Sequence, residues 1–558
     1  MQRFALTACV AAFILQPGCQ SQPKSGGSAQ PAQLFDGLGA HNRPVTTTNP
    51  KAQQYFDQGL IWAFAFNHDE AIRSFTEAAR LDPSCAMAWW GVALCNGPHI
   101  NNPIMTPQSS SAAWTAVQKA LALKITANPR ERALIDALSK RYAAQPPSDR
   151  RPLDEAYAAA MAEVWRANPD DADIGTLYAE SLMDLQPWDL WTKDGQPKAR
   201  ALEIVALLEE VLAKAPSHPG ALHLYIHATE ASAYPERTTA AADRLRNLVP
   251  ASGHLVHMPS HIDVLTGRWE LAAVQNEKAI EVDRRYRKKS PKQGFYNIYM
   301  AHNHHMLAFA SMMEGRGDAA ISAARQVVAG VPVEYGRDQA AIIDPYMAIP
   351  YETLTRFGRW DDMLKEPAPP DYWPITAALW RFERGVAYAA KGDIAGAEAE
   401  QTAFREAAAK VPPDALMAVS PAKTILRTAE HMLAGEIAYR RGHIDEACAQ
   451  LREAVKAENE LLYMEPPEWI QPVRHALGAV LTEAGRHAEA EQVYRDDLKK
   501  WPNNGWSLYG LAGCLKARGA TAEAAEVERQ FEKAWARADT KIGSSCLCVH
   551  RQGVATGG

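Results

Sequence analysis

The sequence predicts an all-α fold, a solenoid of paired antiparallel helices. Small and large residues recur at the same places of a 34-residue frame in several parts of the chain. Almost no run alternates between apolar and polar residues, as a strand with one buried face would. At 558 residues the chain is also too long for one core, whereas a repeat array grows without a central core.

The clearest repeat runs from Ala52 to Cys85. Gly59 and Ala71 occupy its eighth and twentieth places, where small side chains let two antiparallel helices approach closely. The same frame recurs from Ala378, Thr428, Gln471 and Gly505. This pattern resembles the tetratricopeptide repeat, and the resemblance implies helices of about 12–15 residues stacked in a right-handed superhelix.

The matches divide the chain into two arrays. We expect an N-terminal array with a His-rich central groove over residues 46–370 and a C-terminal array over residues 371–540. A flexible tail is expected over residues 541–558. The frame is weaker in the centre, where units begin near Ala172, Pro219, Gly253 and Ala301.

The composition excludes several classes of protein. There are 59 Lys and Arg residues against 65 Asp and Glu, and no Lys/Arg face of the kind that binds nucleic acid. No stretch after the N-terminus has the ~18 apolar residues of a membrane helix. Hydrophobic residues make up 47% of the chain, which excludes wholesale disorder. We therefore expect a soluble, folded body that binds no nucleic acid.

The N-terminus has the features of an export signal. Arg3 precedes an apolar run that ends at Leu15 and is too short to cross a bilayer. Residues 1–19 resemble a bacterial lipoprotein signal that ends at Cys19, although the leucine stands one place early. The resemblance implies a lipid on Cys19, a flexible tether over residues 20–45, and a periplasmic or cell-surface protein that meets the membrane through the lipid alone. Secretion after another cut nearby is the alternative.

Histidine is concentrated in the central part of the chain. Of the 17 His residues, nine lie within about a sixth of the length: His218, His223, His227, His254, His257, His261, His302, His304 and His305. The spacing of His223, His227 and Glu230 is i, i+4, i+7, which places all three on one face of a helix.

A second set, His254, His257 and His261, has the spacing i, i+3, i+7. These side chains share a face if one helix runs through Pro259. A proline inside a helix removes a hydrogen bond and kinks the helix. The alternative is therefore a helix that begins at Pro259, with the first two His on a preceding loop.

In the repeat frame these positions line the concave groove. His302 and His305 take equivalent places in the next unit, and Glu180 and Asp184 lie on the same wall in the unit before. Trp90 also takes a groove position, where its ring could stack on a ligand or simply pack.

Clustered neutral imidazoles beside carboxylates are the ligands that Zn²⁺, Cu²⁺ or Fe²⁺ prefers. The candidate metal ligands are His223, His227, His254, His257, His261, His302 and His305. The carboxylates Glu180, Asp184 and Glu230 could bind the metal, orient an imidazole or act as a general base. One ion, two ions, a polar groove that binds a peptide, and hydrogen-bonded structural His all remain open.

The leading functional prediction comes from the repeats. Proteins that resemble this one typically bind a partner protein or peptide in the concave groove, and we expect the same role here, with a His-rich metal site in the groove. The alternative is a metal-dependent enzyme outside the cytoplasm, of hydrolase or oxidase type, with Glu230 or Glu180 as base. The chain contains no Gly-rich phosphate loop, no H-E-x-x-H and no G-x-S-x-G motif.

Overall fold

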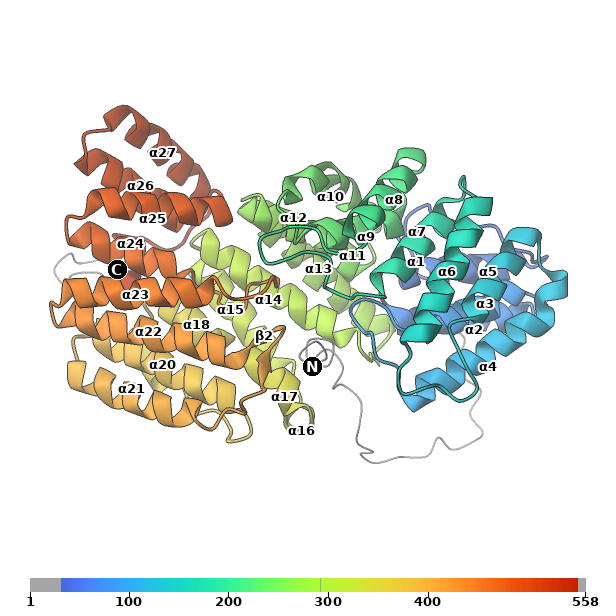
Figure 1. The fold of residues 1–558 in the computed structure, drawn as a ribbon, viewed down its shortest axis with the longest axis horizontal. Coiled ribbons are helices and arrows are strands. Elements are labelled where there is room, and N and C mark those ends of the chain that lie inside the picture. The colour runs from blue at the N-terminus through green and yellow to red at the C-terminus, as the bar shows by residue number, and fades with distance from the viewer. Residues whose placement is uncertain (1–31, 292, 550–558) are drawn as a thin grey trace. The chain divides into compact units, whose positions relative to one another are not determined.

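Helices account for nearly all of the regular structure in the computed structural model, which describes residues 32–291 and 293–549. The chain divides into two units (Figure 1). Unit 1 comprises the described residues up to Ile262 together with Lys278–Met300, and unit 2 comprises Asp263–Glu277 together with the described residues from Ala301 onward.

Unit 1 begins with helices of ten to seventeen residues and ends with shorter ones. In chain order its elements are α1 (Pro50–Phe64), α2 (His68–Leu81), α3 (Ala86–Cys95), α4 (Pro107–Leu123), η1 (Lys124–Thr126), α5 (Pro129–Ser139), α6 (Arg151–Ala167), α7 (Ala172–Met183), α8 (Ala201–Lys214), α9 (Pro219–Thr229), η2 (Pro235–Thr238), α10 (Thr239–Leu245) and α11 (Gly253–His257). Three helices contribute residues to both units: α12 (Pro259–Leu265), α13 (Trp269–Lys289) and α14 (Asn297–Met313).

Unit 2 continues with helix pairs and one very short antiparallel strand pair, β1–β2. Its elements are α15 (Gly317–Ala329), α16 (Val333–Asp338), α17 (Ala340–Ile343), η3 (Asp344–Tyr346), α18 (Ile349–Arg356), α19 (Trp360–Lys365), α20 (Pro374–Ala390), α21 (Ile394–Ala408), β1 (Leu416–Met417), β2 (Ser420–Pro421), α22 (Ala422–Arg440), α23 (Ile444–Glu458), α24 (Val473–Glu483), α25 (His487–Lys500), α26 (Gly505–Ala517), α27 (Thr521–Ala534) and η4 (Leu547–Val549).

Consecutive helices pack as pairs, as the repeat frame predicts. The first pair is α1–α2, and α20–α21, α22–α23, α24–α25 and α26–α27 are later ones (Figure 1). Glycine lies where the helices cross: a Cβ on Gly59 would be 2.7 Å from the Phe75 ring, and one on Gly385 would be 2.9 Å from Leu433. The predicted all-α, tetratricopeptide-like helix–turn–helix fold is confirmed.

The crossing between α24, α25 and α26 provides a test of this packing. Tyr494 is buried, its hydroxyl bonds Ser545, and a Cβ on Gly510 would lie 2.2 Å from its ring. We expect Gly510→Ala to lower the free energy of unfolding by about 1–3 kcal/mol, because the ring has no space to move. Chemical denaturation of the full chain measures this change.

The matched control is Gly513→Ala on the same helix, where a Cβ meets nothing within 4 Å. Because alanine is the better helix former, this change should be neutral or stabilising by up to ~1 kcal/mol. Equal destabilisation by both variants would contradict the packing argument.

In the centre, the observed helices begin close to the predicted places. Helices α7, α9 and α11 begin at the three predicted residues, whereas α14 begins at Asn297 instead of Ala301. Helix α11 ends at His257, and after Met258 a new helix, α12, begins at Pro259. Because proline cannot donate to the preceding turn, the single helix through residues 254–261 is not formed. The two preceding His lie on the short helix α11, not on a loop.

The predicted division between residues 370 and 371 falls within unit 2, between α19 and α20. A division of the repeats into two arrays at that point stays a prediction.

The segment before α1 packs on unit 1 over its described part. Arg43 is buried and donates to Asp171 at 2.8 Å and to Asp173 at 2.9 Å, while Leu38 and Val45 join the hydrophobic core. The flexible tether expected over residues 20–45 is therefore not observed in its described part, residues 32–45. An ion-paired arginine and two apolar side chains hold this part against unit 1. The expected signal over residues 1–19, with Cys19, lies outside the described residues.

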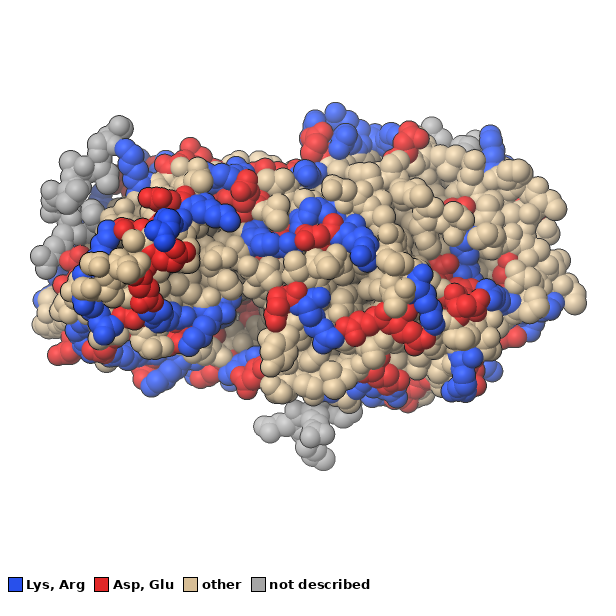
Figure 2. Space-filling view, turned by 90° about the horizontal axis from the view of Figure 1, so that it is seen from above, with Lys and Arg blue, Asp and Glu red and all other residues tan. Residues whose placement is uncertain are grey.

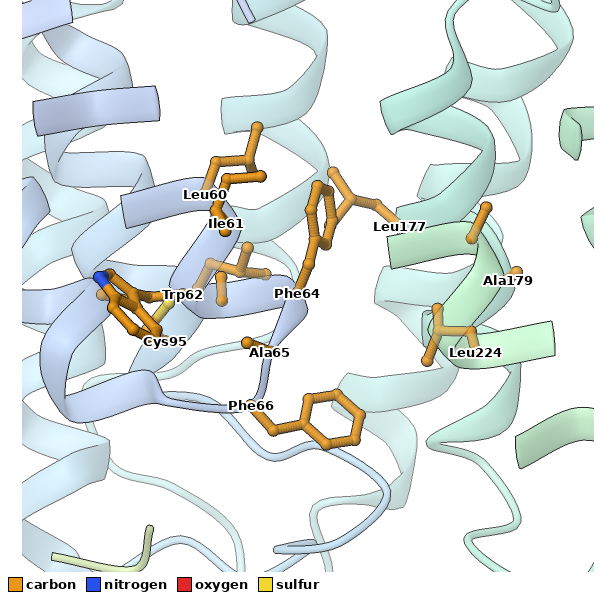
Figure 3. Close-up of a cluster of buried hydrophobic side chains, with 14 of the residues drawn as sticks. Leu60, Ile61, Trp62, Phe64, Ala65, Phe66, Cys95, Leu177, Ala179 and Leu224 are labelled. Atoms are coloured by element: carbon orange, nitrogen blue, oxygen red, sulfur yellow. The ribbon is translucent and has the colours of Figure 1, made fainter. Parts of the chain in front are cut away.

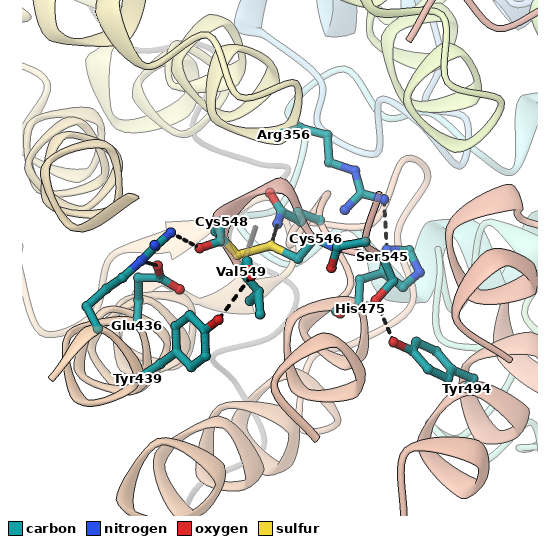
Figure 4. Close-up of a disulfide and its surroundings, with 12 residues drawn as sticks. Arg356, Glu436, Tyr439, His475, Tyr494, Ser545, Cys546, Cys548 and Val549 are labelled. Carbon is teal, nitrogen blue, oxygen red and sulfur yellow. Dashed lines mark hydrogen bonds and ion pairs between the residues drawn. A yellow bond between two sulfur atoms is a disulfide. The ribbon is translucent and has the colours of Figure 1, made fainter. Parts of the chain in front are cut away.

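The segment after α27 also packs, in unit 2 (Figure 4). Cys546 and Cys548 form a disulfide and are buried, and the Tyr439 hydroxyl donates to the carbonyl of Val549 at 3.0 Å. Ser545 donates to the carbonyl of His475 at 2.8 Å. These bonds hold residues 545–549 in place, which corrects the expectation of a flexible tail for that part; residues 550–558 are not described.

Charge is mixed on the face of the molecule that Figure 2 shows. Figure 2 shows basic and acidic side chains interspersed over the face that it presents. Within the described part of the chain, no helix is both long and apolar enough to span a bilayer.

Candidate metal centre

Helix α9 carries the first pair of imidazoles. His218 caps this helix, because its Nδ1 accepts the backbone N–H of Ala221 at 3.1 Å, and Pro219 occupies the first turn. His223 and His227 follow one turn apart, and Glu230 ends the helix. The one-face arrangement predicted for these three residues is consistent with this helix, and all three are buried.

Five imidazoles of unit 1 form a closed ring. The distances between neighbouring ring centroids are 4.8 Å from His223 to His227, 5.6 Å to His261, 4.7 Å to His257, 5.9 Å to His254 and 4.8 Å back to His223. None of the five residues is more than 5% exposed. The break at Pro259 therefore does not prevent convergence, since α11 and α12 both contribute to the ring.

Hydrogen-bond acceptors hold the Nδ1 atoms of three of these rings. The Phe64 carbonyl lies 2.7 Å from His223 Nδ1. The two Glu230 oxygens lie 3.0 Å from His227 Nδ1 and 2.7 Å from His261 Nδ1. Because a carbonyl or carboxylate oxygen can only accept, each Nδ1 carries the proton, and each neutral ring keeps a lone pair on Nε2.

The Nε2 atoms also approach one another. His254 Nε2 lies 3.1 Å from His223 Nε2, and His257 Nε2 lies 2.8 Å from His261 Nε2. Two bare lone pairs at this distance would repel, so either a proton or a metal ion must lie between the members of each pair. His227 Nε2 has no hydrogen-bond partner in the described structure.

Electrostatics favour the neutral form of three of these imidazoles. Burial, together with the neighbouring imidazoles, holds the pKa of His223 and of His254 well below the usual value. Burial also lowers the pKa of His227, although Glu230 opposes the change. Burial would raise the pKa of Glu230, but His227 and His261 outweigh it and lower that pKa to about 2. The cluster thus combines the carboxylate of Glu230 with three imidazoles whose neutral form is favoured, those of His223, His227 and His254.

The ligand atoms of two sets of three residues lie within 4.8 Å of one another. The first set is His223, His227 and His254, and the second is His227, Glu230 and His261. Such a spacing is compatible with a shared ion, because two ligands about 2.0–2.1 Å from a tetrahedral metal lie ~3.3 Å apart. Several His clusters in this structure could therefore hold a metal ion.

The segment that joins α1 to α2, with Phe64, Ala65 and Phe66 labelled in Figure 3, forms an apolar wall of the imidazole cluster. Phe66 has a φ of 54°, in the left-handed region that a bulky residue seldom adopts. Its ring centroid lies 4.5 Å from that of His223 and 5.9 Å from that of His254. Phe64, whose carbonyl fixes His223, belongs to the same segment. Strained residues of this kind occur preferentially at functional sites.

Two further imidazoles lie beside Phe66 and were not among the predicted ligands. The His99 ring centroid lies 4.6 Å from that of Phe66 and 4.4 Å from that of His68. Burial lowers the pKa of His68 to about 4 and that of His99 well below the usual value. Because both residues are more than 100 positions before His223, no local spacing in the sequence associates them with the cluster.

A third set, His41, Asp173 and His218, has ligand atoms equally close but is a different kind of site. His218 Nδ1 accepts a backbone N–H, so its Nε2 carries the proton and donates to Asp173 at 3.0 Å. Arg43 pairs with the same carboxylate at 2.9 Å. These contacts neutralise Asp173 and leave His218 without a free lone pair for a metal ion.

Glu180 and Asp184 are engaged elsewhere in unit 1. Asp184 accepts from Arg141 at 2.6 Å. Burial and the charge of Asp184 raise the pKa of Glu180 to about 8, and burial raises that of Asp184 to about 6. Asp184 is therefore bound by Arg141, with Glu180 as its neighbour, and no hydrogen bond to an imidazole is found for either carboxylate within the described residues.

The remaining predicted site residues have other surroundings. Trp90 is 1% exposed, so it lies in the core and offers no open face to a groove ligand. His302 and His305 lie on the part of α14 that belongs to unit 2, where burial lowers the pKa of His305 to about 4. Their membership of the metal site stays a prediction.

The loop between α7 and α8 brings Trp188 to the imidazole cluster. Its ring centroid lies 5.2 Å from that of His227, edge to face, and the residue is 42% exposed. Trp188 has a φ of 60°, and Trp191 on the same loop donates to the carbonyl of Ala228 at 2.8 Å. Trp188 is thus a partly exposed side chain in contact with an otherwise buried cluster.

No family model matches the chain, and no curated protein does. Among solved structures, human IFIT1 with m7Gppp-AAAA is 13% identical, with 88% of this chain and 91% of that chain covered and a TM-score of 0.29. Yeast Tom70 is 11% identical, with 86% and 93% covered and a TM-score of 0.28. At these scores the fold assignment rests on the helix pairs of the chain itself.

Proposed function

We propose that this protein binds a divalent transition-metal ion, Zn²⁺, Cu²⁺ or Fe²⁺, through the imidazole cluster of unit 1. The observation that carries the proposal is the pattern of hydrogen bonds. His223, His227 and His261 each hold an acceptor at Nδ1 and keep the Nε2 lone pair for the interior of the cluster. Metal-ligating histidines in proteins almost always have such an acceptor on the second ring nitrogen.

The ligand set that we assign is His223, His227 and His254, with Glu230 as the residue that orients His227 and His261. Neutral imidazoles favour Zn²⁺, Cu²⁺ or Fe²⁺ over Mg²⁺ or Ca²⁺, which prefer oxygen ligands. Three protein ligands leave a coordination position open. An ion held in this way would act as a Lewis acid or lower the pKa of a bound water.

A purely structural role explains the cluster less well. In the absence of a ligand, His227 Nε2 and His254 Nδ1 find no hydrogen-bond partner among the described residues. Leaving a buried polar atom unsatisfied costs about 1–3 kcal/mol. The cluster also concentrates imidazoles around a strained Phe66, which structural packing does not require.

The alternative of a metal-dependent hydrolase or oxidase receives less support from the geometry. Glu230 orients two imidazoles with its two oxygens, and its pKa of about 2 makes it a weak base. Glu180, with its pKa raised to about 8, is protonated at neutral pH and lies with Asp184. Neither Glu230 nor Glu180 therefore has the surroundings expected of a general base beside a metal-bound water.

Binding of a partner protein or peptide through the groove of the repeats is the second part of the proposal, supported by the helix-pair architecture. We propose in addition that the chain is exported and held at a membrane by lipid on Cys19. Mass spectrometry of the mature protein from its host should find a lipid-modified N-terminal Cys19; a mature chain that begins elsewhere would contradict lipid attachment.

Elemental analysis of the purified full chain without an affinity tag tests metal binding. We expect close to one equivalent of Zn, Cu or Fe after loading near neutral pH and dialysis. His218→Ala is the matched control, because His218 is equally buried but uses its Nε2 proton for Asp173. A chain that retains no metal, or a control that loses it, would refute the assigned site.

Replacing Trp188 tests whether the metal exchanges past this side chain. Because Trp188 contacts His227 and is 42% exposed, Trp188→Ala should open a path to the cluster. Release of the ion to a chelator is expected to accelerate by about tenfold, or ~1.4 kcal/mol in the barrier. Tyr234→Ala, at another exposed aromatic, serves as control and should leave the rate unchanged. Equal rates in the wild type and Trp188→Ala would place the path elsewhere.

A further inference from the structure

Residues 545–549, which follow α27 and include η4, pack into unit 2 (Figure 4). Ser545, Cys546, Cys548 and Val549 are each at most 3% exposed, although this segment has only one short turn of regular structure. We call the segment the C-terminal latch. So short a segment cannot form a core of its own, and its burial therefore depends on a surface of unit 2 that fits it.

The latch lies against the first helices of three consecutive helix pairs. Its turn η4 contacts α20 and α24, and two side chains near the end of α22 bind it. We call the surface that these three helices contribute the acceptor face. In the repeat frame the first helices line the concave groove, which is the surface that repeat arrays use for binding. The latch therefore occupies the place where a partner peptide is expected.

The acceptor face binds the latch through its backbone. The Tyr439 hydroxyl donates to the Val549 carbonyl at 3.0 Å, and the Arg440 guanidinium donates to the Cys548 carbonyl. Glu436 accepts from the same guanidinium at 3.0 Å and so orients it. Main-chain hydrogen bonds provide affinity that does not depend on the side chains of the bound segment. The acceptor face thus has the means to bind a peptide.

Side chains of the latch add specificity. The Ser545 hydroxyl lies 2.7 Å from that of Tyr494 and donates to the carbonyl of His475 at 2.8 Å. The Leu547 side chain packs against Gly358, where a Cβ would lie 3.3 Å from Cδ1 of the leucine. A glycine at this position therefore leaves room for a leucine-sized side chain.

The disulfide between Cys546 and Cys548 gives the latch its shape. It encloses a single residue, and the backbone N–H of Val549 donates to the carbonyl of Cys546 at 3.1 Å. Because the bridge restricts the unbound segment, less conformational entropy is lost on binding, which strengthens binding by about tenfold for so short a loop. Within the described residues the other cysteines are free thiols, so a reductant acts there on this bridge alone.

We infer that the acceptor face is a peptide-binding site that the latch occupies in the same chain, and that reduction of the Cys546–Cys548 disulfide opens it. The inference rests on the proposed peptide binding by the repeats and names the surface and its occupant. A competing peptide has to present two consecutive backbone carbonyls to Arg440 and Tyr439, preceded by a leucine-sized side chain.

Reduction by a small dithiol is a balanced two-electron exchange. One thiolate of the reductant attacks a sulfur of the Cys546–Cys548 bridge, and its second thiol then resolves the mixed disulfide. The products are two cysteine thiols and a cyclic disulfide of the reductant, with two electrons and two protons transferred. Because both cysteines are buried, the exchange proceeds from molecules in which the latch has detached.

Hydrogen exchange of the full chain tests the control by the disulfide. The amides of residues 546–549 should be protected in the oxidised chain and should exchange at least about tenfold faster after reduction with dithiothreitol. Tyr439→Phe keeps the disulfide but loses one donor to the latch, so its exchange rate should be intermediate. Tyr388→Phe is the matched control, because the Tyr388 hydroxyl on α20 bonds Arg384 instead of the latch.

A synthetic, disulfide-closed peptide of residues 544–549 tests the acceptor face. We expect it to bind the full-length Cys546→Ser/Cys548→Ser variant with a Kd of about 100 μM or lower. The oxidised wild type should bind the same peptide at least about tenfold more weakly, because its own latch fills the site. A peptide with serine in place of both cysteines should also bind the variant about tenfold more weakly. The melting temperature of the variant shows whether it is folded, and exchange in the reduced wild type needs no substitution.

Three results would overturn the inference: no peptide binding to the double variant up to about 1 mM, equal peptide binding to the oxidised wild type, or exchange at residues 546–549 that reduction leaves unchanged. Failure of the proposed function is distinguishable, because a random peptide library tests peptide binding by the repeats without reference to the latch. Peptides captured from the library together with unchanged exchange would keep the proposed function and overturn this inference alone.

Discussion

The His223→Ala/His227→Ala variant is expected to lose metal affinity by at least about 100-fold. Two of three nitrogen ligands disappear, and the hydrogen bonds that these rings donate to the Phe64 carbonyl and to Glu230 disappear with them. Loss of even an orienting partner costs about 10–100-fold in affinity, so loss of two ligands exceeds that range. Competition against a chelator of known affinity measures the change.

A graded series separates ligand loss from general disruption of the fold. Glu230→Gln keeps all imidazoles but exchanges the carboxylate that holds His227 and His261 for an amide. Its affinity should fall by about 10–100-fold, between the wild type and the double variant. If the metal-free double variant melts at a lower temperature than the metal-free wild type while metal affinity is unchanged, the cluster is structural.

Glu383→Gln is expected to stabilise the chain at pH 8 by on the order of 4 kcal/mol and to have little effect at pH 5. Burial raises the pKa of Glu383 from 4.5 to about 8, so the folded state binds a proton that the unfolded state has released. A raised carboxyl pKa favours the folded state below pH ~4.5, and this contribution is lost as the pH rises to about 8. An amide has the same shape and no charge to bury.

Thermal unfolding across this pH range measures the effect. The melting temperature of the wild type should fall between pH 5 and pH 8. The melting temperature of Glu383→Gln should fall less over the same range. The melting temperature of the variant still falls, because burial also raises the pKa of Glu352, Glu468 and Glu436, and these groups lose their protons over the same pH range. Glu406→Gln, at an exposed position of α21, is the control and should leave the profile unchanged. Parallel profiles for wild type and Glu383→Gln would contradict a buried, uncompensated carboxyl.

Much of the fold could be predicted from local pattern. The spacing of Gly59 and Ala71 in a repeat frame predicts helix pairs, because only small residues allow two helix backbones to approach closely. The three central starts at Ala172, Pro219 and Gly253 follow from the same frame. At Pro259 the sequence allowed either one kinked helix or a loop followed by a new helix. The structure has a short helix on each side of Met258 instead.

The candidate site could be predicted only in part. The concentration of His between residues 218 and 305 indicated a cluster, and five of those residues form the closed ring. The sequence did not distinguish the roles of the carboxylates. Glu230 accepts hydrogen bonds from the imidazole ring, whereas Asp184 pairs with Arg141, about forty residues earlier in the chain. A carboxylate has the same appearance in a sequence whichever cation or donor it meets.

The sequence by itself determined the repeat architecture and the part of the chain that carries the imidazoles, because both depend on spacing within a helix or between neighbouring helices. Only the tertiary structure decided which nitrogen of each imidazole is available. The Phe64 carbonyl, some 159 positions before His223, fixes one tautomer, and Glu230 fixes two more. Tertiary packing likewise brought His68 and His99 beside Phe66 and left one oxygen of Glu383 and one of Glu468 buried without a hydrogen-bond partner among the described residues. Such contacts join residues that no local periodicity relates, so they exist only once the chain has folded.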